Sequence, residues 1–282
     1  MRKIIIVVSL LLLFVLQSYS FAEVKTFSRE YTYNAGEVDS KVSSCVTAMR
    51  EVKKMLLEEL GTYLKSITEV KNFELTKDQI TSLTAGIVKT EIIDEKWDGH
   101  AYWIKAKIVA DKDDVVKSID NLRKDHDKSR GLENAKKRSD VLLEANKKLR
   151  EEFALAKGNV KQEIQQRYDN SIKELSSIEW YESGLRNYKN VDYEAAVRDF
   201  SNAIELNPEY ATAYNNRGFA YMKLSKPNEA IIDFNKANEL NSKNATAYDN
   251  REIADNRPNN KESIMDNITE LFKGISKEVI GK

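Results

Sequence analysis

The sequence predicts a multi-domain chain with a small α+β domain at its N-terminus, a long charged helical spacer, and an all-α solenoid of stacked helix pairs at its C-terminus. Three observations support this prediction. An Asp-Gly pair stands between two β-rich runs near residue 98. Residues 113–176 are dense in charged side chains and contain no proline. The last third of the chain resembles itself at an offset of 34 residues.

Residues 1–22 have the composition of a secretory signal peptide. A positively charged start precedes the apolar run 4–16, which is too short to span a bilayer comfortably. Small residues, Ser20 and Ala22, then occupy the two positions that a signal peptidase reads. We expect cleavage after Ala22 and export to the periplasm or envelope; an uncleaved N-terminal anchor is the alternative.

An α+β domain is expected over residues 23–112. Residues 24–33 carry β-formers and predict a strand. Residues 35–60 predict a helix that ends at Gly61, because apolar side chains recur there every three or four positions. Residues 77–85 predict a short helix, capped by Thr76 with Gln79.

The pair Asp98-Gly99 predicts a two-residue hairpin turn. In that register Trp97 faces His100 and Ile93 faces Ile104. One side of the ribbon then carries apolar side chains that can cover the 35–60 helix: Ile87, Ile93, Tyr102, Ile104, Ala106 and Ile108.

This order of strand, "AMREVKKMLLEELG" helix and "EKWDGHAYWIKAKI" hairpin resembles small bacterial envelope domains, such as the N-terminal domain of flagellar assembly protein T. The resemblance covers about 90 residues. It implies an envelope-located assembly or binding domain rather than a reaction.

Residues 113–176 predict a helical or coiled-coil spacer. A modest heptad seam is formed by Leu142, Asn146, Leu149, Phe153, Ala156 and Val160. Gly158-Asn159 is a break signal. Two structures fit: one long helix that self-associates through the seam, or a helical hairpin that folds back at Gly158.

Residues 177–282 contain the repeat. Glycine recurs at 184 and 218 and alanine at 196 and 230, so the two helices of each unit can approach closely. Phenylalanine recurs at 200 and 234, and we expect Phe200 to face the next unit. These residues resemble the tetratricopeptide repeat (TPR) over about 177–275, in "WYESGLRNYKNVDYEAAVRDFSNAIELNPEY" and "YNNRGFAYMKLSKPNEAIIDFNKANELNSKN". We expect units at 177–210 and 211–244, a degenerate unit at 245–275 and a tail helix.

Stacked helix pairs leave a concave surface, and the resemblance implies that a protein or peptide partner binds there. The expected groove residues are Tyr181, Glu182, Leu185, Asn215, Asn216, Phe219, Met222, Asp249 and Asn250. The alternative is that the repeats pack mainly against the chain's own 113–176 helix.

Composition argues against several function classes. The chain has 45 basic and 45 acidic residues, which gives no support for nucleic-acid binding. Its single cysteine, Cys45, and its two distant histidines, His100 and His126, suggest no metal site and no catalytic residues. We expect no cofactor, no small-molecule substrate and no enzymatic activity.

The sequence therefore predicts an exported, non-enzymatic scaffold that binds a protein partner through a short TPR array. The alternative is a structural coiled-coil oligomer in the assembly of an envelope machine, such as a flagellar or secretion complex.

Overall fold

The computed structural model describes residues 23–67, 70 and 72–240. Its elements have the order β1 (Val24–Asn34), α2 (Lys41–Lys65), α4 (Lys77–Ala85), β2 (Thr90–Trp97), β3 (Ala101–Asp111), α5 (Lys112–Lys124), α6 (His126–Leu155), α7 (Asn159–Lys189), α8 (Tyr193–Leu206), α9 (Ala211–Lys223) and α10 (Pro227–Leu240). The expected signal peptide and third repeat lie outside the described residues. Within the described part of the chain, no helix is long and apolar enough to cross a membrane.

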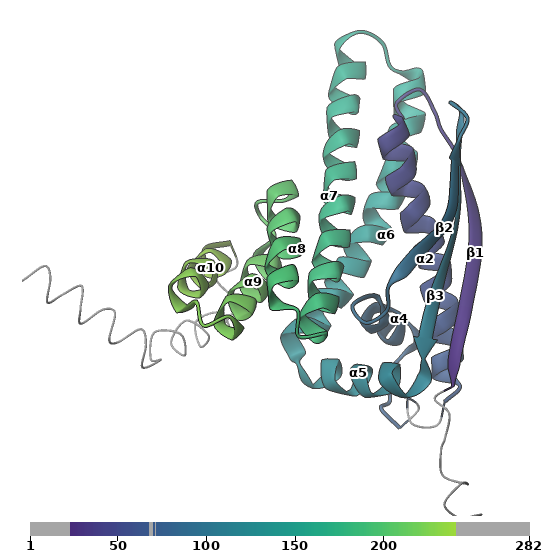
Figure 1. Cartoon of the computed structure of the whole chain (residues 1–282). Coiled ribbons are helices and arrows are strands. Elements are labelled where there is room, and N and C mark those ends of the chain that lie inside the picture. The colour runs from purple at the N-terminus through teal and green to yellow at the C-terminus, as the bar shows by residue number, and fades with distance from the viewer. Residues whose placement is uncertain (1–22, 68–69, 71, 241–282) are drawn as a thin grey trace, which may run out of the picture.

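An antiparallel sheet of three strands, in the order β1-β3-β2, forms the N-terminal layer (Figure 1). Alternate side chains of β3 are buried and face α2, from Tyr102 to Ile108. The strand expected at 24–33 and the helix expected at 77–85 are both present. Thr76 and Gln79 form the expected capping box.

The expected hairpin register is wrong by one position on each strand. Trp97 pairs with Tyr102, so Gly99 and His100 are the central turn residues. The cause is the side chain of Asp98, whose Oδ1 accepts hydrogen bonds from the backbone amides of His100 and Ala101, at 2.8 and 2.7 Å. Gly99 takes the positive φ of +96° that this turn requires.

Ile93 consequently does not pair with Ile104. A β-bulge lies between Ile92 and Asp94. The side chains of Ile92 and Ile93 are both exposed. Edge strands commonly carry bulges, which disfavour pairing with a further strand.

Helix α2 also differs from its prediction. It begins at Lys41, because Ser40 and Ser43 form a capping box, and it continues past Gly61 to Lys65. Gly61 is buried where α2 meets α4: a Cβ placed there would lie 2.5 Å from Thr81 Oγ1. This glycine therefore permits close helix packing and does not end the helix.

Residues 113–176 fold back on the rest of the chain and do not form an extended spacer. Helices α6 and α7 form an antiparallel pair that stands beside α2 (Figure 1). The reversal occurs at Gly158, which has a positive φ of +59°. Of the two structures considered from the sequence, the hairpin is the one observed.

One hydrophobic core runs from β1 through α2, α6 and α7 into the first repeat. The predicted self-association seam contributes to it: Leu142, Asn146, Leu149 and Phe153 are buried within this chain. Val160, at the end of the seam, is exposed. The apolar part of the seam is therefore not available for pairing with a second copy, which corrects that expectation.

Replacing Leu142 by alanine tests this packing. We expect a loss of about 2–5 kcal/mol in the free energy of unfolding, because the truncation leaves a cavity in the core. Val141→Ala, at the exposed neighbouring position, should change stability by less than about 0.5 kcal/mol. Denaturant titration measures both variants, and similar values for the two would contradict burial of the seam.

Candidate partner-binding surface

Two helix pairs form the C-terminal part of the described chain. The end of α7 packs against α8, and α9 packs against α10. Each pair closes over a glycine: a Cβ at Gly184 would lie 2.6 Å from the ring of Phe200, and one at Gly218 would lie 2.6 Å from the ring of Phe234. The repeated glycines therefore permit the close helix packing that their 34-residue spacing predicts. The ring that each glycine contacts belongs to its own unit, whereas Phe200 was expected to face the next unit.

One arginine joins the two helices of the second pair to each other and also to the first pair. The Arg217 guanidinium donates to both carboxylate oxygens of Asp233, at 2.8 and 2.7 Å. It also donates to Ser201 Oγ, on α8, at 3.0 Å. Asp233 is nearly fully buried, so this bidentate pair holds α9 against α10, and the hydrogen bond to Ser201 joins them to α8.

The groove residues expected from the sequence are mostly enclosed by the chain itself. Six of the seven described ones are buried, and the seventh is half-buried. The buried six are Tyr181, Glu182, Leu185, Asn215, Asn216 and Met222; the half-buried one is Phe219. Asp249 and Asn250 lie outside the described residues. The expectation of an open groove at these seven positions is therefore corrected.

Helix α6 covers the first repeat at Tyr181. The Tyr181 hydroxyl lies against Gly131, where any larger residue would collide with it. Its oxygen accepts a hydrogen bond from Asn216 Nδ2, at 3.3 Å. Burial raises the pKa of Tyr181 above its ordinary value. Tyr181 and Asn216, both expected to line the groove, thus contact each other inside the protein.

Glu182 is enclosed by α2 instead. Lys53 Nζ lies 2.5 Å from Glu182 Oε2 and 2.8 Å from Glu179, and Arg50 Nη1 lies 3.1 Å from each carboxylate. Burial alone would raise the pKa of Glu179, but the charges of Lys53, Arg50 and Arg186 outweigh it and lower that pKa to about 2. We call these four residues of α2 and α7 (Arg50, Lys53, Glu179 and Glu182) the charge cluster.

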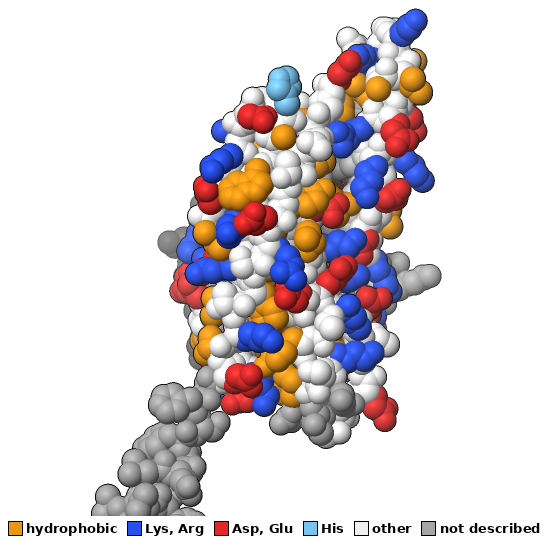
Figure 2. Space-filling model, turned by 90° about the vertical axis from the view of Figure 1, so that its right-hand side faces the viewer, with side chains coloured by type: hydrophobic (Ala, Val, Ile, Leu, Met, Phe, Trp, Pro, Cys, Tyr) orange, Lys and Arg blue, Asp and Glu red, His pale blue; other side chains and the backbone are white. Residues whose placement is uncertain are grey.

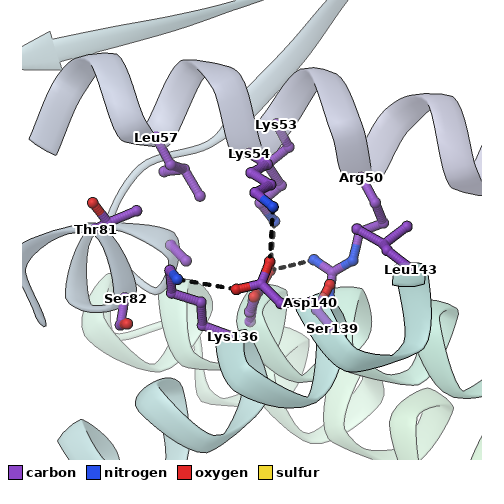
Figure 3. A pocket seen from close by; sticks show the side chains of 12 residues that line it. Arg50, Lys53, Lys54, Leu57, Thr81, Ser82, Lys136, Ser139, Asp140 and Leu143 are labelled. Carbon is purple, nitrogen blue, oxygen red and sulfur yellow. Dashed lines mark hydrogen bonds and ion pairs between the residues drawn. The ribbon is translucent and has the colours of Figure 1, made fainter. Parts of the chain in front are cut away.

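A small cavity adjoins the charge cluster between α2, α4 and α6 (Figure 3). Lys54 and Lys136 both reach Asp140 there, at 3.2 and 3.0 Å. The cavity volume is about 40 Å³, room for about three water molecules. This space is too small for a segment of a partner protein.

A larger cleft, of about 460 Å³, lies between α5, the start of α6 and the first repeat, with one residue from α9. We call it the lysine cleft, because four lysines and two aspartates line it. The charged residues are Asp114, Lys117, Asp125, Lys128, Lys189 and Lys223. Leu185 is the one predicted groove residue among its lining residues.

The lysines of the cleft differ in their pairing. Lys189 contacts Asp114 at 2.8 Å, and Lys128 contacts Asp125. Among the described residues, Lys117 and Lys223 have no ion-pair partner. The cleft therefore retains an excess of positive charge after its internal pairs are formed.

Aromatic side chains complete the lysine cleft. The Tyr188 ring lies against Tyr193 with centroids 5.2 Å apart, and Lys128 Nζ lies 4.8 Å from the Tyr188 centroid. Burial raises the pKa of Tyr188 to about 12, so it is a neutral hydrogen-bonding group at physiological pH. Sequence reasoning stopped at Leu185, which is buried. Tyr188 and Lys189, three and four positions further along the same helix, are half-buried and also line the cleft.

The family comparison agrees with the observed helix pairs. Residues 184–225 match a TPR repeat model, and residues 211–244 match a tetratricopeptide repeat model. No curated protein matches the chain. The solved structure titled "Crystal structure of MamA protein" is 18% identical, with 60% of this chain and 84% of that chain covered and a TM-score of 0.31. The resemblance of the N-terminal domain to flagellar assembly protein T gains no support from these matches.

The charge cluster should make the free energy of unfolding vary with pH in the acidic range. Because the folded-state pKa of Glu179 lies below its ordinary value of 4.5, its contribution is present above pH 4.5 and lost as the pH falls towards about 2. The Glu179 side chain is 37% exposed, which moderates the effect. We expect Glu179→Gln to be less stable at neutral pH and to show a shallower loss of unfolding free energy across this window.

Denaturant titrations between pH 5 and 2.5 provide the measurement. Glu144→Gln is the matched control, since Glu144 is an exposed carboxylate on α6 that pairs only loosely with Lys147, at 3.5 Å. A wild-type slope in the Glu179 variant would show that the charge cluster does not cause the acid sensitivity.

Proposed function

Because residues 184–244 carry two tetratricopeptide repeats, we propose that this chain is a non-enzymatic scaffold that binds an acidic segment of a protein partner in the lysine cleft. Such repeats suggest protein–protein interaction. The partner would be an extended chain, whose carboxylates meet the lysines and whose apolar or aromatic side chains meet Tyr188 and Tyr193.

The observation that carries this proposal is the uncompensated positive charge in the large opening beside the repeats. Lys117 comes from α5 and Lys223 from α9, so two segments far apart in sequence each place a lysine side chain in the same cleft. Complementary charge accelerates encounter and selects between partners, and its effect weakens as salt is added. The volume of about 460 Å³ suits a few residues of a partner.

A binding measurement with defined peptides tests the cleft. The probes are a fluorescein-labelled hexapeptide of alternating glutamate and tyrosine, and a second one of alternating lysine and tyrosine. We expect the acidic probe to bind and the double variant K117E/K223E to bind it at least tenfold more weakly, with less salt dependence. Fluorescence anisotropy gives both affinities.

The control replaces two lysines outside the cleft, in the variant K65E/K226E. Both are exposed residues that do not line the cleft, and this variant keeps the same net charge as K117E/K223E. Equal weakening by the two variants would mean that total charge, rather than the cleft, attracts the probe.

We also propose that the scaffold acts in the bacterial envelope after export. The support is the sequence of residues 1–22, with its positive start, short apolar run and small residues before position 23. The expected result is a mature protein that begins at Glu23 in the periplasmic fraction, measured by fractionation and N-terminal sequencing. A cytoplasmic full-length chain would contradict it.

A further inference from the structure

A separate pocket of about 240 Å³ lies between β1, α2 and α6. It shares no lining residue with the lysine cleft, so a ligand bound there would be independent of the proposed function. Its polar and charged walls come from three elements. They include Tyr31 and Tyr33 of β1, Thr47 and Glu51 of α2, and Asn146, Lys147 and Arg150 of α6.

Buried polar atoms of this pocket have no hydrogen-bond partner among the described residues. Asn146 is 2% exposed, yet neither its Nδ2 nor its Oδ1 makes a hydrogen bond. Thr47 is 6% exposed, and its Oγ1 has none either. Folded proteins pair nearly all such groups, so these three atoms are available to a ligand that brings donors and acceptors of its own.

The folded chain removes the other reason for an asparagine at this position. A polar residue in a coiled-coil seam can fix the register of two paired chains. Here Leu142 and Leu149, which flank Asn146 in the seam, are buried in the chain's own core. Asn146 therefore does not fix the register of two paired chains, and it lines a pocket instead.

The charged residues of the pocket carry both signs. Arg150 is held in place, because its Nη2 donates to the Asn34 carbonyl at 2.6 Å and its Nε lies 3.2 Å from Asp39 Oδ2. Lys147 adds a second cation from α6, and Glu51 adds a carboxylate from α2. A ligand with a carboxylate and an ammonium group would satisfy both walls.

We propose that this pocket binds a free amino acid with a primary carboxamide side chain. The carboxamide pairs with the Asn146 amide, which offers a donor and an acceptor side by side. The ligand carboxylate meets Arg150 and Lys147, its ammonium group meets Glu51, and Thr47 completes the hydrogen bonding. The pocket volume lies below the range of drug-sized sites, which agrees with a ligand this small.

Titration calorimetry of the mature chain, from residue 23 onward, with L-glutamine and L-asparagine tests the proposal. L-Norvaline serves as the comparator, since it keeps the ammonium and carboxylate groups but lacks the amide. We expect at least one amide ligand to bind at least tenfold more tightly than norvaline. Affinities equal to that of norvaline, or no heat of binding from either amide at millimolar concentration, would mean that the pocket holds water only.

Variants of the unpartnered residues identify the pocket as the binding site. Asn146→Leu should abolish amide binding, and Thr47→Val should weaken it about tenfold. Ser44→Ala is the matched control, because Ser44 is also buried and unpartnered on α2 but does not line the pocket. Wild-type affinity in both Asn146→Leu and Thr47→Val would overturn the assignment.

Thermal unfolding separates lost binding from lost folding. The Asn146 side chain makes no hydrogen bond in the described chain, so Asn146→Leu should unfold at or above the wild-type temperature when no ligand is present. Added glutamine should raise the unfolding temperature of the wild type and of Ser44→Ala but not that of Asn146→Leu. If Asn146→Leu does not fold, the affinity of Thr47→Val decides.

Discussion

The packing of α7 against α2 depends on four charged side chains that meet between the two helices. Arg50 and Lys53 are nearly fully buried, so each must have a carboxylate within reach. Glu179 and Glu182 provide these from α7, three positions apart and therefore on one face of the helix. Removing either carboxylate while the helices stay packed would leave buried positive charge uncompensated. The first repeat is held on the sheet domain for this reason.

This constraint explains why a repeat of this kind lacks an open inner face here. The helix that would line a groove, α7, also forms half of the hairpin with α6 and contacts α2. Its inward residues therefore meet the chain's own helices, as Tyr181 meets Gly131. What remains accessible is the edge of that face, where α5 approaches α7 and the lysine cleft opens. Figure 2 shows a different face, the one on the side of the sheet, where acidic and basic side chains are interspersed with apolar ones.

Short-range sequence patterns were sufficient to predict those features that depend only on residues close in sequence. The capping box of α4 and the close helix approach at the repeat glycines involve residues close in sequence, and each was predicted. The contact of Phe200 with Gly184 of its own unit was not. The predicted hairpin register was wrong because the Asp98 side chain accepts hydrogen bonds from two backbone amides, which the Asp-Gly pattern does not reveal. The enclosure of Glu182 was missed for a different reason. Its partner Arg50 is 132 positions away, and no local pattern reveals such a contact.

The length of α7 has a mechanical consequence. Its 31 residues form an unbroken helix, about 46 Å long at 1.5 Å per residue. It is a stiff rod, clamped by the charge cluster towards the end that carries the first repeat. A force applied to the repeats would therefore rotate α7 as a rigid unit and so act on the α6–α7 hairpin. The helix contains no flexible segment that could bend instead.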